Sequence, residues 1–219
     1  MPEVKICGLT RPEDAAAAER AGATYGGVIL APGGPRSIDE ARSRKVFAGT
    51  SLVRCGVFVD ERPDRVAALV DRVGLDVVQL HGDEGPEVAE AIGRNTGVEV
   101  WKVIRVRTAQ DVIHGARHYG NVVQGMLLDG WSEAARGGTG SRFPWQEVAE
   151  HRERFDPSIR LIAAGGLRPE NVSELIALLG PDIVDVSSGV ESAPGIKSNQ
   201  LIRSFVAAAG RGAIRKEVL

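Results

Sequence analysis

The chain alternates short apolar runs with amphipathic segments, and this alternation repeats eight times within 219 residues. The apolar runs are rich in Val, Ile and Leu without strict alternation, which is typical of strands buried on both faces. The expected strands are centred near Ile6, Val28, Gly56, Val78, Lys102, Leu127, Ile162 and Val184. Apolar residues in the intervening segments recur at i, i+3, i+4 and i+7, the spacing of a helix with one buried face. One such set is Val66, Leu69, Val70 and Val73.

Eight strand–helix units of about 27 residues fill the chain and leave no room for a second domain. A barrel of eight such units typically needs roughly 200–250 residues. A doubly wound open sheet gives the same alternation, but eight consecutive units favour closure. We therefore predict an α/β fold, a single-domain (β/α)8 TIM barrel over residues 1–210, with a C-terminal tail over 211–219.

The charge balance and the cysteine content restrict the partners. The chain is 26% charged with a formal net charge of −2, which argues against nucleic acid or an anionic membrane. No apolar run approaches a membrane span, and the N-terminus lacks the apolar core of a signal peptide. Cys7 and Cys55 both fall in expected strands, so we predict a cytoplasmic protein, as a monomer or homodimer.

The carboxyl ends of barrel strands form the active-site face, so the residues that end each strand are the first candidates. The first strand ends at Cys7, where Gly8 breaks it, and Thr10 with Glu13 predicts a capping box for the next helix. Ser37 with Glu40 predicts a second capping box. A thiol at this place serves as a base or nucleophile, or it is a small buried hydrophobe, and the sequence leaves both open.

Further strand ends offer Arg36, Asp60, His81 and Asp129. Asp129 is either catalytic or a cap for its loop. Cys7 and Asp129 would face each other across the barrel mouth and form one acid and one base. Work near neutral pH would require the thiol pKa to fall slightly from about 8.5 and the carboxyl pKa to rise by roughly three units from about 3.9.

Glycine-rich loops follow the last two expected strands, where barrels often bind phosphate through backbone N–H groups. The residues concerned are Gly165, Gly166, Ser188 and Gly189, although ordinary turn chemistry gives the same composition. The longest connection contains a further glycine-rich stretch at 137–140, which predicts a binding loop or lid unless it is a surface loop without a role.

Metal binding is not expected. His114 and His118 share a helical face, but no third ligand stands where a zinc site needs one. His81 is the histidine with a functional case, because it ends the fourth strand. We predict neither a metal nor a cofactor, and a phosphorylated small molecule as the ligand.

Seven motifs together resemble the phosphoribosylanthranilate isomerase family, in family order and at family spacing. They are Lys5–Thr10, Gly56–Val59, Gln79–Glu84, Leu127–Asp129, Gly137–Gly140, Ala164–Val172 and Asp185–Glu191. The resemblance extends from residue 5 to Lys197, and the first and last motifs are the most specific.

The resemblance implies an Amadori rearrangement of N-(5'-phosphoribosyl)anthranilate in tryptophan biosynthesis, without a cofactor. It implies Asp129 as general acid and Cys7, as thiolate, as general base. Arg36 would face the anthranilate, and Asp185 and His81 would bind the substrate. The four loop residues named above would hold the phosphate.

Two alternative functions share features with this one. The aminoimidazole-carboxamide ribotide isomerase of histidine biosynthesis runs the same rearrangement, but its first strand supplies an aspartate where this chain has Cys7. A barrel that only binds a sugar phosphate would need neither Cys7 nor Asp129. Substrate turnover, as opposed to binding alone, separates these possibilities.

Overall fold

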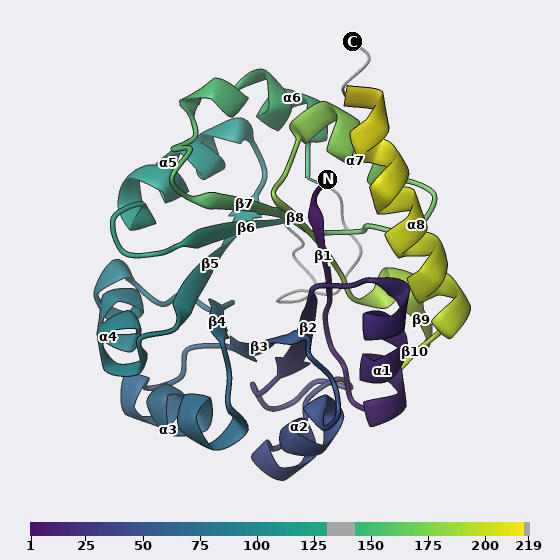
Figure 1. Cartoon of the computed structure of the whole chain (residues 1–219). Coiled ribbons are helices and arrows are strands. Elements are labelled where there is room, and N and C mark those ends of the chain that lie inside the picture. Colours follow the sequence, from purple (N-terminus) through teal and green to yellow (C-terminus); the bar gives the residue numbers. More distant parts are fainter. Residues whose placement is uncertain (131–142, 217–219) are drawn as a thin grey trace.

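The computed structural model describes residues 1–130 and 143–216, the last four of these by their backbone alone. Eight parallel strands close into a barrel, and the helices form a ring around it (Figure 1). The barrel strands are β1 (Glu3–Ile6), β2 (Tyr25–Ile29), β3 (Val53–Phe58), β4 (Val77–Leu80), β5 (Glu99–Val106), β6 (Gly125–Gly130), β7 (Arg160–Ala163) and β8 (Ile183–Val186). Every expected strand centre falls within one of them, so the predicted TIM barrel is confirmed.

The helices that follow the strands differ in length. They are α1 (Pro12–Ala21), α2 (Glu40–Phe47), α3 (Pro63–Val73), α4 (Pro86–Thr96), α5 (Ala109–Tyr119), α6 (Trp145–Glu150), α7 (Val172–Leu179) and α8 (Asn199–Lys216). Two single-turn 3-10 helices, η1 (Arg152–Arg154) and η2 (Ser188–Val190), follow α6 and β8. A short hairpin of β9 (Glu191–Ala193) and β10 (Ile196–Lys197), which we did not predict, separates η2 from α8.

Alternation along the strands divides the apolar side chains into two cores, because successive residues of a strand point to opposite faces. Outward-facing residues such as Ile6, Val78 and Leu128 pack beneath the helices. Inward-facing residues such as Trp101 and Leu127 fill the barrel itself. The barrel interior is therefore a packed core that ends below the carboxyl ends of the strands.

Helix starts differ from the predicted capping boxes. α1 begins at Pro12 without a side-chain cap, and the Thr10 hydroxyl donates instead to the Gly195 carbonyl at 2.6 Å. Asp39 caps α2 by accepting from the Arg42 N–H at 2.8 Å. Both predicted boxes are wrong, because the Thr10 hydroxyl has a tertiary partner and an aspartate stands next to the second helix.

The C-terminal helix α8 packs against α1 and α7, as Figure 1 shows. It runs to Lys216, so the domain boundary expected at residue 210 falls inside a helix, and the division into barrel and tail stays a prediction. In the described ranges, no helix is long and apolar enough to cross a bilayer.

Candidate active site

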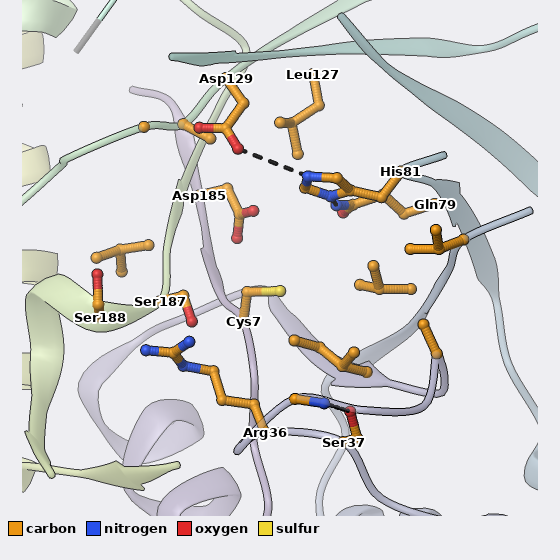
Figure 2. A pocket seen from close by; sticks show the side chains of 18 of the residues that line it. Cys7, Arg36, Ser37, Gln79, His81, Leu127, Asp129, Asp185, Ser187 and Ser188 are labelled. Carbon is orange, nitrogen blue, oxygen red and sulfur yellow. Dashed lines mark hydrogen bonds and ion pairs between the residues drawn. The ribbon is translucent and has the colours of Figure 1, made fainter. Parts of the chain in front are cut away.

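A cavity of about 470 Å³ opens at the carboxyl ends of the barrel strands. Figure 2 shows Cys7, Asp129 and Asp185 pointing into it from β1, β6 and β8. All the predicted site residues line this one cavity: Cys7, Arg36, His81, Asp129, Gly165, Gly166, Asp185, Ser188 and Gly189. The glycine-rich stretch 137–140 lies outside the described residues. The structure therefore brings the predicted residues together at one cavity, and their assignment as site residues stays a prediction.

Asp60 is the strand-end candidate that does not line the cavity. Its carboxylate accepts from the Asp83 N–H at 2.6 Å, and its own N–H donates to Glu84 at 2.7 Å. Asp60 therefore ties the loop after β3 to the loop after β4.

The Cys7 thiol lies in a close contact with Gly27 of β2. A side chain at that glycine would place its Cβ 3.0 Å from Cys7 Sγ and 3.2 Å from Lys5 Cε. Gly8, with φ 71°, turns the chain just after the thiol, a conformation that glycine adopts without strain. The absence of a side chain at position 27 therefore makes room for both Cys7 and Lys5.

Burial raises the pKa of the Cys7 thiol above its ordinary value, and the nearby Asp185 carboxylate adds to the rise. Lys5 opposes the rise through its charge and a hydrogen bond, and Lys197 opposes it through charge. The expectation of a slightly lowered thiol pKa is therefore wrong. The thiol pKa rises because Cys7 is buried beside a cation that Asp185 shares, at 3.1 Å from Lys5 Nζ.

Asp129 stands near the end of β6, where burial raises its pKa from 3.8 to about 6 and Asp185 adds to the shift. A hydrogen bond from the Gly130 N–H and the charge of Arg105 oppose it. The pKa of Asp129 therefore shifts in the expected direction, but it rises by less than the three units expected from the sequence. At pH 7 roughly a tenth of the molecules carry a protonated Asp129, so this carboxyl is able to act as a proton donor near neutrality.

His81, which follows β4, is neutral. Burial, Arg105, Lys5 and Lys102 lower its pKa to about 4. Its Nε2 atom lies 3.7 Å from Asp129 Oδ2, marked by a dashed line in Figure 2. Because a neutral imidazole carries no charge, this contact between histidine and carboxylate is not an ion pair at neutral pH.

Arg36 is held at the cavity edge by the carboxylate of Glu191. Its Nε and Nη2 atoms donate to the two carboxylate oxygens at 2.8 and 2.7 Å. Lys197 donates to the same carboxylate at 2.8 Å and to the Ser187 carbonyl at 3.1 Å. Paired donors of this kind fix the plane of a guanidinium. The β9–β10 hairpin thereby orients Arg36 towards the cavity.

The loops after β7 and β8 meet at Gly189. A Cβ at this residue would lie 1.9 Å from the Leu167 carbonyl oxygen, so no side chain fits there. Gly165 and Gly166 have φ angles of 77° and 63°, which only glycine adopts readily. Within the described ranges, the backbone N–H groups of Gly166, Ser188 and Gly189 have no hydrogen-bond acceptor. Such unpaired donors at a cavity wall suit an anion.

Sequence reasoning gave no role to four polar residues of this region: Lys5, Gln79, Glu191 and Lys197. Two of them, Lys5 and Gln79, stand two positions from a predicted site residue on the same strand or at its end. Side chains two apart share a strand face, so this spacing was a usable signal. Glu191 and Lys197 lie on the hairpin, for which the sequence offered no such pattern.

Among residues 1–130 and 143–216, no three His, Cys, Asp or Glu side chains are grouped so as to hold a metal ion.

The fold and the cavity define a single-domain (β/α)8-barrel protein whose ionisable side chains gather at the carboxyl ends of its strands. Residues 4–208 match the model of the family described as N-(5'-phosphoribosyl)anthranilate (PRA) isomerase. The chain belongs to this family, so the resemblance seen in its motifs is confirmed.

Known members are similar over nearly the whole chain. The N-(5'-phosphoribosyl)anthranilate isomerase of Rubrobacter xylanophilus is 41% identical over 211 residues, covering 95% of this chain and 99% of the relative. A structure of monomers of the dimeric isomerase from Thermotoga maritima has 35% identity and a TM-score of 0.83, and the match covers 96% of this chain and 99% of that one. A family structure in complex with reduced 1-(o-carboxyphenylamino)-1-deoxyribulose 5-phosphate has 33% identity, a TM-score of 0.84 and the same coverage.

Proposed function

We propose that this chain isomerises N-(5'-phosphoribosyl)anthranilate to 1-(2-carboxyphenylamino)-1-deoxyribulose 5-phosphate in tryptophan biosynthesis, with Asp129 as general acid and Cys7 as general base. Membership of the family supports the reaction. The observation that supports the two assignments is that both side chains face one cavity from different strand ends.

The first half of the reaction opens the ribose ring. Protonated Asp129 donates its proton to the ring oxygen, and the bond between that oxygen and C1' breaks. The electron pair of the bond goes to the oxygen, while the anilino nitrogen supplies electrons to C1' and leaves an iminium ion. The pKa of about 6 keeps a fraction of Asp129 protonated for this step.

The second half forms the ketone. The Cys7 thiolate removes the proton from C2', and the electrons of the C–H bond neutralise the iminium to give an enolamine. Addition of a proton at C1' and loss of the proton from the C2' hydroxyl then yield the product ketone, so the rearrangement is balanced without an oxidant or a cofactor. The ammonium of Lys5 stabilises the thiolate against its burial.

Substrate binding uses the two ends of the cavity. The unpaired N–H groups of Gly166, Ser188 and Gly189, together with Gly165, suit the phosphate. Arg36 suits the anthranilate: Glu191 occupies its Nε and Nη2 edge, and the guanidinium offers its plane for stacking on the ring and its remaining N–H groups for the carboxylate. Asp185 and His81 line the space between these ends and face the sugar. Anchoring both ends orients the ribose between acid and base.

The acid–base assignment is tested by the loss of anthranilate-type fluorescence when freshly made substrate meets the protein. We expect turnover by the wild type and a fall of at least about a hundredfold in kcat for Cys7→Ala and for Asp129→Ala. Asp64→Asn, which changes an exposed carboxylate of α3, is the control and should be fully active. If the wild-type protein binds the substrate without converting it, the isomerase function is wrong and the protein is a barrel that only binds a sugar phosphate.

The phosphate assignment is tested by competition with inorganic phosphate. Gly166→Ala should weaken both substrate and phosphate binding, because the methyl group and the φ angle of 63° displace the loop. Gly49→Ala is the matched control, since Gly49 has a φ angle of 77° but lies beyond α2 with nothing near its Cβ position. Equal effects of the two variants on binding would contradict the assignment.

The assembly is a monomer or a homodimer, and the cytoplasm is the proposed location. The Thermotoga maritima relative is described as dimeric. Sedimentation velocity at several protein concentrations distinguishes the two states. Cys7 and Cys55 are both free thiols, which supports a reducing compartment.

A further inference from the structure

Gln79 forms a buried link between a thiol and the histidine of the site. Its side chain is 1% exposed and lies on the face of β4 that points into the barrel. The amide oxygen Oε1 is 3.8 Å from Cys55 Sγ, and the amide nitrogen Nε2 is 3.4 Å from His81 Nδ1. The other ring nitrogen, His81 Nε2, is buried without a hydrogen bond and faces Asp129 (Figure 2).

Two hydrogen-bond patterns fit these positions, and they place the histidine proton on opposite nitrogens. In the first, the Cys55 thiol donates to the amide oxygen and the amide N–H donates to Nδ1, so Nε2 carries the proton. In the second, the amide is turned over, Nδ1 carries the proton and donates to the amide oxygen. A bare Nε2 lone pair would then face the Asp129 carboxylate.

Chemistry at both ends of the link favours the first pattern. Burial raises the pKa of Cys55 to about 12, so this sulfur stays protonated and acts as a donor. At the other end, Nε2–H attracts the ionised Asp129, whereas a lone pair would repel it. Burial keeps the imidazole neutral and the charges of Arg105, Lys5 and Lys102 add to this effect, so the choice is between two neutral tautomers.

We propose that Gln79 is a positioning residue that fixes His81 in the Nε2–H tautomer, with this N–H directed at Oδ2 of Asp129. The proposal rests on Asp129 as the general acid. A donor on Oδ2 leaves Oδ1 as the oxygen that carries the transferable proton, and it supports the carboxylate that forms after the transfer. The present 3.7 Å contact must shorten by roughly 0.7 Å to become a hydrogen bond, a tightening that catalytic contacts often show when ligand binds.

The tautomer of the wild-type protein is measured directly by nitrogen-15 NMR after histidine labelling, at pH 7. The resonances of His81 are those that disappear in His81→Gln. We expect a protonated Nε2 and an unprotonated Nδ1. A protonated Nδ1, or a rapid exchange between tautomers, would overturn the proposal whether or not the protein turns over substrate. The measurement therefore separates this proposal from the proposed function.

A variant then tests the consequence for Asp129. Gln79→Met keeps the length of the side chain but removes its donor. We expect mixed His81 tautomers, a fall in kcat/KM of roughly tenfold to a hundredfold, and an upward shift of the low-pH limb that Asp129 sets. Gln110→Met is the matched control, because Gln110 also contacts a histidine, His114 at 2.9 Å, but on the exposed face of α5. If the variant loses activity while the His81 tautomer and the low-pH limb stay unchanged, Gln79 is a packing residue only.

Discussion

The two ends of the barrel treat their polar groups differently. At the amino end, Arg160 pairs with Glu3 and donates to the Tyr25 hydroxyl at 2.8 Å, while Trp101 donates to Glu99 at 2.9 Å. At the carboxyl end, His81 Nε2 and three backbone N–H groups have no hydrogen-bond partner within the described ranges, and Asp129 has a raised pKa. The amino end satisfies its polar groups internally, and the carboxyl end keeps them for a ligand.

This contrast separates stability from function along the barrel axis. A buried polar atom without a partner, as His81 Nε2 is, costs free energy and persists where a ligand supplies the missing partner, whereas the three backbone N–H groups are half-buried or exposed and are open to a ligand. Substitutions at the amino end should therefore lower the free energy of unfolding and spare turnover, whereas substitutions at the mouth should lower turnover without lowering the free energy of unfolding.

The largest expected effect on stability belongs to Trp101→Ala. Trp101 is fully buried in the barrel interior, so the cavity left behind should lower the free energy of unfolding by about 3–5 kcal/mol. Urea denaturation measures this loss. Turnover of the folded fraction at low temperature should match the wild type. A folded variant with reduced kcat would contradict the separation of stability at the amino end from function at the carboxyl end.

Asp129→Asn should lower turnover and raise the free energy of unfolding. Turnover falls by at least about a hundredfold because the acid is lost, while the folded protein gains roughly 2–3 kcal/mol at pH 7 because a buried carboxylate is removed. The folded-state pKa of about 6 lies above the ordinary 3.8, so the wild type loses this stability as pH rises through that interval. The melting temperatures of the two proteins should therefore converge below pH 4. A constant difference would indicate another cause.

A change of pH has a smaller effect: kcat/KM should change about tenfold per pH unit on the rising and falling limbs of its pH profile. The active form needs protonated Asp129 and ionised Cys7, yet the carboxyl has a pKa of about 6 and the thiol pKa is raised. Below about pH 6 Asp129 stays protonated and only the thiolate fraction grows, so activity should rise with pH up to that value. It should then stay level, because gain of thiolate cancels loss of the acid, and fall above the thiol pKa. The residual activity of Asp129→Asn should lack the break near pH 6, and a retained break would assign it to another group.

Arg160→Met should have the smallest effect. The guanidinium is partly exposed and bonded to Glu3 and Tyr25, so its loss should cost up to about 1 kcal/mol of stability. Kinetic constants should not change, because the site lies at the other end of the barrel. A change in KM with unaltered stability would contradict the division.

Much of this molecule was predictable because strand alternation is a local property. Apolar runs separated by helical spacing predicted the barrel, and the ends of the runs, Asp60 after the third excepted, predicted side chains that line the cavity at the mouth. The same period of two, applied one step further, would have added Lys5 beside Cys7 and Gln79 beside His81.

Features that depend on distant partners escaped the sequence. Arg36 was predicted at the site, but its pairing with Glu191 joins residues 155 positions apart. Thr10 has a good capping sequence, yet its hydroxyl bonds Gly195 from the hairpin. The thiol pKa was misjudged for a similar reason, since the sequence showed neither the burial of Cys7 nor the sharing of Lys5 with Asp185.

The contact between Gly189 and the Leu167 carbonyl has a consequence for substrate range. Any side chain at position 189 would push the two loops apart, so this end of the cavity is set by the backbone and resists change by substitution. The neighbouring wall is set by the side chain of Arg36, which stands in the loop between β2 and α2 and lies beside Ser187 and Ser188 (Figure 2). Selection for new ligands should therefore keep the glycine-lined loops and change the side chains of the loop after β2. New reactions on phosphorylated substrates would then arise from substitutions in that loop alone.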